Sequence, residues 1–281
     1  MAVLDFGEPA SPVGLVFVHA NGFNAMAYRR LLAPLSKRMR IWAPDLRGHG
    51  RTTLSAEPSG RRNWRDLARD LEHLLDRIDG PPVVLAGHSM GGTAGLLAAA
   101  GRRERVSRLV LIDPVIWSRP ATIGMNLPLV ERLLRRSALA EGARRRRAVF
   151  ASREEALAAY RGRGAFRGWE DGWIADFLVD GLTESPEGLR LSCPPGWEAS
   201  NYAAQAHDPW RAVRRVKRPM TVLRAETGSI CNLRETPADA PWVDVRTIAG
   251  SGHMVPMHQP QAVGDALLEA AMQTRSPSAA T

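Results

Sequence analysis

The sequence predicts an α/β fold in which a mostly parallel, twisted sheet is covered by helices on both faces. Short apolar runs alternate with segments of helical periodicity along most of the 281 residues. Strands buried on both faces have this short, uninterrupted apolar character. A content of 44% hydrophobic and 24% charged residues excludes wholesale disorder. The length suits one elaborated domain.

Six strands and four helices are predicted for the core. Each strand is a short apolar or β-branched run, and the strands lie at residues 13–18, 40–44, 83–86, 109–112, 220–223 and 243–248. The helices show apolar or small residues at helical spacing, and they lie at residues 28–38, 64–78, 93–100 and 262–272. The tail from Thr274 to Thr281 is rich in Ser, Ala and Pro and is expected to be frayed.

Residues 117–208 interrupt the alternation. They show helical patterns, for example at residues 127–136 and 154–160, and no strand pattern. We therefore predict a core of residues 1–116 and 209–281, with residues 117–208 inserted between two core strands as a helical cap. Half of the eight tryptophans fall in the insertion; most should form the core of the cap, and one or two should line a cleft.

The net charge of +9 would fit nucleic-acid binding if it were concentrated. The excess of basic over acidic residues is instead spread out, at +5 in residues 1–116, +1 in 117–208 and +3 in 209–281. A nucleic-acid interface is a basic stripe or patch, and the densest basic run, residues 144–147, lies in a helical pattern beside acids. We expect no nucleic-acid partner and only mild attraction of anionic substrates.

The sequence also carries expectations about location. No apolar run approaches the roughly 18–20 residues that cross a membrane, and residues 1–8 lack the basic and apolar parts of a signal peptide. The two cysteines, Cys193 and Cys231, could form one bridge at most, which excludes a disulfide scaffold. A reduced, soluble, cytoplasmic protein without a membrane partner is expected. No motif indicates an oligomeric state.

A candidate nucleophile lies in Gly87-His88-Ser89-Met90-Gly91, between a predicted strand and a predicted helix. The Gly-x-Ser-x-Gly pattern in this position forms a sharp turn that lifts the serine hydroxyl clear of the sheet. Neighbouring elements crowd the positions two residues on either side, so only small residues fit there. The following helix directs its N-terminal N–H groups at the site and favours negative charge.

A serine hydroxyl needs a base to accept its proton, and the chain has seven histidines. His253 follows the last predicted strand, at the sheet edge where parallel-sheet proteins bind ligands. His258 is the alternative base. His73 is expected on a helix surface, whereas His49 and His88 are expected to form local hydrogen bonds.

Four motifs occur in the order in which the α/β-hydrolase fold family carries them: His-Ala-Asn-Gly at 19–22, Asp-Leu-Arg-Gly-His-Gly at 45–50, Gly-His-Ser-Met-Gly-Gly at 87–92 and Gly-His at 252–253. The chain resembles this family over about residues 12–116 and 209–273, and the segment between them lies in the family's cap position. The resemblance implies that residues 45–52 form a structural loop beside the site, without a catalytic role.

The resemblance also implies an oxyanion hole made of two backbone N–H groups. One belongs to the residue after the nucleophile, Met90. The other follows a His-Gly pair in the family; this chain has His19-Ala20 there, which moves the donor position to Asn21. Phe23 is the alternative donor if the loop is longer than usual. Two such donors typically supply about 3 kcal/mol or more each.

The acid of the triad departs from the usual family pattern. Members usually carry an Asp shortly after the penultimate strand, but Gly228 occupies that position here. A second family solution places the acid at the end of an earlier strand, where this chain has Asp113. The alternative acid is Glu226, although it lies too early to point at His253. Asp113 could also simply cap a turn, as Asp-Pro sequences do. We predict Asp113.

The resulting prediction is a serine hydrolase, without cofactor or metal, that cleaves carboxylic esters or lactones through an acyl-enzyme on Ser89. Family members that open epoxides or displace halide have Asp as nucleophile, so Ser89 argues against both reactions. The alternatives are a cofactor-free perhydrolase or C–C bond hydrolase using the same triad, and a non-catalytic binding protein with a hydrolase fold. No motif identifies the small-molecule substrate.

Overall fold

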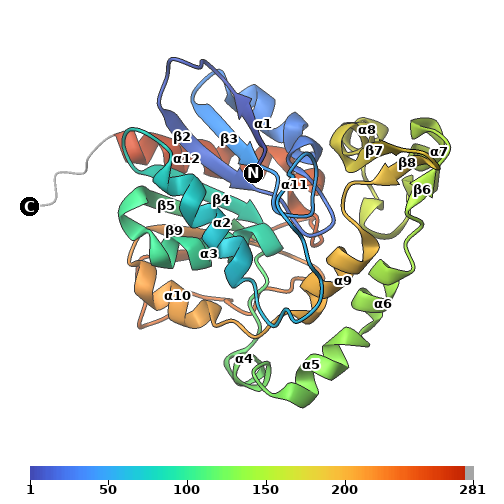
Figure 1. Ribbon diagram of the computed structural model, residues 1–281. Helices are drawn as coiled ribbons and strands as arrows, with labels where there is room; N and C mark the ends of the chain where they lie inside the picture. The colour runs from blue at the N-terminus through green and yellow to red at the C-terminus, as the bar shows by residue number, and fades with distance from the viewer. Residues whose placement is uncertain (276–281) are drawn as a thin grey trace, which may run out of the picture.

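A seven-stranded sheet forms the centre of the computed structural model, which describes residues 1–275 (Figure 1). Its strands, in the spatial order β1-β3-β2-β4-β5-β9-β10, are β1 (Val3–Phe6), β2 (Val13–Val18), β3 (Arg40–Pro44), β4 (Val83–His88), β5 (Val106–Ile112), β9 (Met220–Ala225) and β10 (Val243–Ile248). Every neighbouring pair is parallel except β1 and β3. The predicted mostly parallel sheet is therefore confirmed, with the unpredicted antiparallel strand β1 added at one edge.

Helices cover both faces of this sheet, as predicted. Residues of β2 alternate between the faces: Leu15 and Phe17 belong to one hydrophobic cluster, and Val16 and Val18 to the other. The first cluster includes α1 (Arg29–Leu35) and α12 (Pro260–Arg275), and the second includes α2 (Arg65–Asp76), α3 (Met90–Gly101) and α10 (Pro209–Val216). Helices α2 and α10 each bury one apolar stripe against the sheet, whereas α3 is buried on nearly all sides.

Some predicted boundaries differ from the structure. The helix predicted at 28–38 is shorter at both ends: the 3₁₀ turn η1 (Ala25–Tyr28) takes up its first residue, and α1 ends at Leu35 with Ser36 as its C-cap. Thr274 and Arg275 belong to α12, so the expected frayed tail does not begin at Thr274. The remainder of that tail, residues 276–281, lies outside the described residues.

The inserted segment is not wholly helical, and the expectation that it lacks strands was wrong. Six α-helices and a three-stranded antiparallel sheet lie between β5 and α10: α4 (Arg119–Gly124), α5 (Pro128–Arg135), α6 (Ala138–Arg144), β6 (Val149–Phe150), α7 (Arg153–Tyr160), α8 (Asp171–Gly181), β7 (Leu182–Ser185), β8 (Gly188–Leu191) and α9 (Pro195–Ala203). Strands of two to four residues carry too few side chains for a visible alternation. In Figure 1 these elements lie together on one side of the molecule.

The topology collects the candidate site residues at one edge of the sheet. Strands β4, β5 and β9 are parallel neighbours, and they end at His88, Ile112 and Ala225. The carboxyl ends of parallel strands face the same side, where ligands bind in such folds. The loop between β10 and the short helix α11 (Val255–His258) reaches the same edge. Within residues 1–275, no helix has the length and apolar character needed to cross a membrane.

Candidate active site

Ser89 lies in a strained turn between β4 and α3. Its φ of 55° and ψ of −120° are unusual for a residue with a side chain. The flanking glycines are required by contact: a Cβ atom on Gly91 would lie 2.3 Å from the carbonyl oxygen of His19, and one on Gly87 would lie 2.6 Å from the carbonyl carbon of Gly91. The Gly-x-Ser-x-Gly pattern is therefore dictated by the close approach of backbone on both sides.

The structure brings Ser89, His253 and Asp113 into one hydrogen-bonded chain. The Ser89 Oγ lies 3.0 Å from His253 Nε2, and His253 Nδ1 lies 2.7 Å from Asp113 Oδ2. Because an ionised carboxylate only accepts hydrogen bonds, Nδ1 carries the proton and Nε2 is free to accept the serine hydroxyl proton. The arrangement suits proton transfer from Ser89 to His253.

Asp113 is fully buried and fully hydrogen-bonded. Besides His253, its carboxylate accepts from the backbone N–H groups of Ala225 (3.1 Å) and Ile230 (3.3 Å) and from the hydroxyl of Ser229 (2.5 Å). Burial opposes ionisation, but the hydrogen bonds from His253 and Ser229 outweigh it and hold the pKa of Asp113 below its ordinary value. The loop after β9, where the family usually carries its acid, here supplies donors to Asp113 instead.

The alternative residues lie in other interactions. Glu226 is exposed, and its carboxylate accepts from the N–H of Gly250 at 3.0 Å. His258 accepts from the N–H of Gly252 through Nδ1, while its Nε2 lies 3.3 Å from the carbonyl of Arg167. Of Asp113, His253, Glu226 and His258, only Asp113 and His253 are hydrogen-bonded to each other, and His253 is also hydrogen-bonded to Ser89 through Nε2.

His88 and Tyr28 hold the backbone of the loop that carries His253, and the Gly-x-Ser-x-Gly motif alone did not indicate this role. His88 donates from Nε2 to the carbonyl of His253 at 2.8 Å, and its Nδ1 accepts from the Tyr28 hydroxyl at 2.8 Å. The expectation of local hydrogen bonds for His88 was therefore wrong, because the fold places two distant segments beside it. Burial lowers the pKa of His88 to about 3, so it stays neutral at pH 7.

The backbone N–H groups of Asn21 and Met90 donate no hydrogen bond within residues 1–275, and both residues line the same cavity as Ser89. The neighbouring amides are engaged, because Gly22 donates to His49 Nε2 at 3.1 Å and Phe23 donates to the carbonyl of Ala20 at 3.2 Å. Asn21 and Met90 thus have the free donors that an oxyanion hole needs, whereas Phe23 uses its N–H to close a turn.

Ser89 and His253 open into a cavity of about 630 Å³, within the range of small-molecule sites. Both the core and the inserted segment line it. The inserted segment contributes mostly apolar and aromatic side chains, among them Trp117, Leu134, Leu139, Ala143, Tyr160 and Phe166. The other tryptophans of the insertion, Trp169, Trp173 and Trp197, are buried in the hydrophobic clusters.

A buried ion pair is the main charged feature of the cavity wall. The guanidinium of Arg146 contacts the carboxylate of Glu198 and donates to the Tyr160 hydroxyl at 3.0 Å. Burial disfavours the charge of Arg146, but the Glu198 carboxylate keeps its pKa above the ordinary value. The charges of Arg146 and Glu198 neutralise each other, and the exposed Arg163 is the other charged side chain of the lining. Among residues 1–275, no group of three or more His, Cys, Asp or Glu side chains is placed to hold a metal ion.

The buried histidines predict a stability that falls with acidification. Burial lowers the pKa of His19, His49, His88 and His207, to about 3 for His88 and about 4 for His207. Unfolded histidines have a pKa near 6.5, so below that pH the unfolded chain binds more protons than the folded one. Each of these histidines should then lower the free energy of unfolding by up to about 1.4 kcal/mol for each pH unit below 6.5.

Urea unfolding at pH 7.5 and at pH 5.5 measures this effect, and a loss of about 3–5 kcal/mol is expected. His207→Gln should weaken the pH dependence, whereas the same change at His73, which is exposed on α2, should leave it as it is. Equal unfolding free energies at the two pH values would contradict the prediction.

Comparison with known proteins identifies the family of the chain and supports its fold. The chain matches the sequence model of the alpha/beta hydrolase family over residues 15–266. It is 36% identical to lipase LipV of Mycobacterium tuberculosis over 38% of this chain and 40% of the lipase. It is 34% identical to the monoglyceride lipase of Rattus norvegicus over 44% of this chain and 42% of that enzyme. Each match spans less than half of the curated relative.

A solved structure extends the likeness over nearly the whole chain. E-2-(acetamidomethylene)succinate hydrolase matches with a TM-score of 0.75 over 95% of this chain and 93% of that chain, at 22% sequence identity. At this identity the similarity shows a shared fold and nothing about a shared substrate.

Proposed function

The chain belongs to the alpha/beta hydrolase family, and from this premise we propose that it is a serine hydrolase that cleaves carboxylic esters or lactones. The observation that carries the proposal is the continuous hydrogen-bonded chain from Ser89 through His253 to buried Asp113. That chain opens into a largely apolar cavity beside two unengaged backbone N–H groups. The similarity to two lipases favours an ester as the bond that is cleaved.

In the proposed first step, Ser89 Oγ attacks the substrate carbonyl carbon while His253 Nε2 takes the hydroxyl proton. The carbonyl oxygen becomes an oxyanion and accepts hydrogen bonds from the N–H groups of Asn21 and Met90. Asp113 stabilises the imidazolium through Nδ1. When the tetrahedral intermediate collapses, His253 donates the proton to the leaving alkoxide, and the acyl group stays on Ser89.

In the second step, a water molecule takes the place of the leaving alcohol. His253 removes a proton from the water, which attacks the acyl carbon and forms a second oxyanion in the same donor pair. Collapse returns the proton to Ser89 Oγ and releases the carboxylic acid. In a lactone the alcohol and the acid belong to one molecule, so the product is a hydroxy acid.

Covalent labelling tests this proposal against a non-catalytic binding role. A fluorophosphonate reagent should modify Ser89, and peptide mass spectrometry should locate the adduct on residues 87–91, because only an activated serine reacts quickly with such reagents. A series of p-nitrophenyl esters and lactones, assayed in parallel, should show turnover for at least one class. An unlabelled Ser89 without turnover would refute a serine hydrolase.

The size and aromatic lining of the cavity predict a limit on acyl size. Aromatic side chains from the inserted segment, including Tyr160 and Phe166, border the space around Ser89. Rates with p-nitrophenyl esters should therefore fall as the acyl chain outgrows the cavity, with kcat/KM for the hexadecanoate about tenfold or more below that for the butanoate. Equal values of kcat/KM across the series would show that the inserted segment does not enclose the acyl group.

A further inference from the structure

The side chain of Asn21 is anchored to α9 of the inserted segment. Its Nδ2 donates to the carbonyl of Glu198 at 3.0 Å, and its Oδ1 accepts from Nδ2 of Asn201 at 2.8 Å. Asn201 is completely buried and Asn21 is only 8% exposed, so water does not compete for these bonds. The residue proposed to stabilise the oxyanion through its backbone is thus held through its side chain.

Arg61 determines the direction of this chain of hydrogen bonds. Its guanidinium donates to Asn201 Oδ1 at 2.5 Å, and a guanidinium can only donate. The Asn201 amide must therefore turn its oxygen to Arg61 and its Nδ2 to Asn21. Asn21 must then present Oδ1 to Asn201, which leaves its Nδ2 for the Glu198 carbonyl. Both amide orientations follow from one buried cation.

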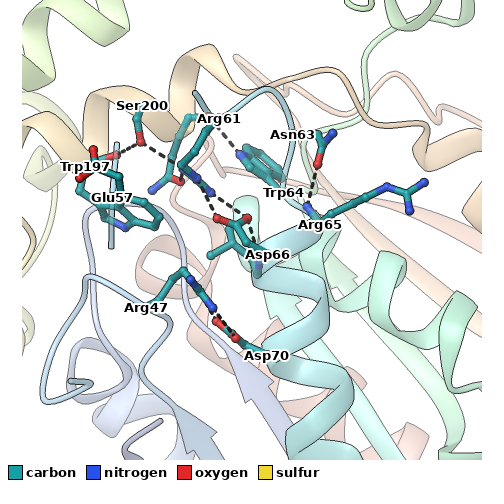
Figure 2. Close-up of polar contacts among 12 residues, drawn as sticks. Arg47, Glu57, Arg61, Asn63, Trp64, Arg65, Asp66, Asp70, Trp197 and Ser200 are labelled. Carbon is teal, nitrogen blue, oxygen red and sulfur yellow. Dashed lines mark hydrogen bonds and ion pairs between the residues drawn. The ribbon is translucent and has the colours of Figure 1, made fainter. Parts of the chain in front are cut away.

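Arg61 is itself immobilised from several sides (Figure 2). It makes a two-bond ion pair with Asp66, at 2.8 and 2.9 Å, and donates to the Ser200 hydroxyl at 3.0 Å. The guanidinium carbon lies 4.0 Å from the centre of the Trp197 ring, a cation–π distance. The indole N–H of Trp64 donates to the carbonyl of Asn201 at 3.1 Å. The core and α9 are joined here by side chains in fixed positions.

We propose that Arg61 and Asn201 are positioning residues that set the oxyanion hole by orienting Asn21. The proposal rests on the proposed serine hydrolase function. The loop from His19 to Asn24 carries Ala20 where family members usually have glycine. Among residues 20–23, Asn21 is the one whose backbone N–H has no hydrogen-bond acceptor in residues 1–275. A displacement of about 1 Å at a reacting geometry can cost about 100-fold in rate, so the hydrogen-bonded anchor has a direct kinetic consequence.

The substitution Asn201→Asp keeps the shape of the side chain and tests whether Asn201 must donate a hydrogen bond to Asn21. The new carboxylate can still accept from Arg61, but it places an acceptor against the Asn21 Oδ1. With the best p-nitrophenyl ester, kcat should fall about 10- to 100-fold while KM changes little, because the loss concerns the oxyanion and not substrate contacts. The affinity of a trifluoromethyl ketone, which forms an oxyanion on Ser89, should fall by the same factor as kcat/KM.

The matched control is Asn63→Asp. Asn63 lies before α2, in the same segment as Arg61. Its Oδ1 accepts a hydrogen bond from the backbone N–H of Arg65, and an aspartate at this position would keep that bond (Figure 2). This variant should retain wild-type kcat and ketone affinity. A second test variant, Asn21→Ala, keeps the backbone N–H and removes only the anchor, and it should reproduce the kinetic loss if Asn201→Asp fails to fold.

The outcomes separate the two proposals. Folded Asn201→Asp and Asn21→Ala proteins with wild-type kcat and ketone affinity would overturn the positioning role while the hydrolase stands. A lowered unfolding midpoint with unchanged kinetics would also overturn it, since that result marks a purely structural role. If the wild-type protein shows neither Ser89 labelling nor turnover, the proposed function fails and the positioning role fails with it.

Discussion

Replacing Ser89 with alanine is expected to lower kcat for ester hydrolysis by on the order of 10⁶-fold, as loss of the serine does in a comparable triad. The alanine side chain has no oxygen to form the acyl-enzyme, so both chemical steps are lost. Folding should be unaffected, because the Ser89 hydroxyl is hydrogen-bonded to His253 on the cavity side and does not cap α3. Steady-state kinetics with the best p-nitrophenyl ester, together with a thermal unfolding curve, measures both effects.

Ser36→Ala is a suitable control, because that hydroxyl only donates to the carbonyl of Ala33 at the end of α1. It should keep wild-type kcat. Substantial turnover by a folded Ser89→Ala protein that contains no wild-type enzyme would show that Ser89 is not the nucleophile.

Replacing Asp113 with asparagine should lower kcat about 10⁴-fold, the loss found for this change in a comparable triad. The asparagine Oδ1 can keep the bonds from Ala225 and Ser229, which turns its NH₂ group toward His253 Nδ1. That contact favours the tautomer protonated on Nε2, which cannot accept the serine proton. KM should change little, since Asp113 is fully buried and does not line the cavity.

Glu226→Gln provides the comparison for Asp113→Asn. Glu226 is exposed and bonded to the Gly250 N–H, and a glutamine can keep that bond, so kcat should stay near the wild-type value. Unfolding in urea should accompany both assays, because Asp113 also organises the loop after β9. A strong loss of kcat in Glu226→Gln with near-normal kcat in folded Asp113→Asn would reverse the assignment of the acid.

The sequence by itself determined the core of the fold. The strand at residues 13–18 was predicted with the bounds that the structure has, because a strand buried on both faces is a continuous apolar or β-branched run. It also determined the sharp turn that carries Ser89, since the glycines around Ser89 are required by backbone contacts within a few residues or with one neighbouring strand. Local periodicity and local steric limits are properties that a sequence displays directly.

Only the tertiary structure decided which distant residues meet. The short strands β7 and β8 exist because they pair with each other, and neither has enough residues to show a pattern alone. Asp113 lies beside His253 because two parallel strands end at one edge, and the serine after Gly228 turns out to donate to that aspartate. The contacts of Asp113 with His253 and Ser229 join residues more than a hundred positions apart. Hydrogen-bond partners at that separation depend on the packing of whole elements and leave no periodic signal in the sequence.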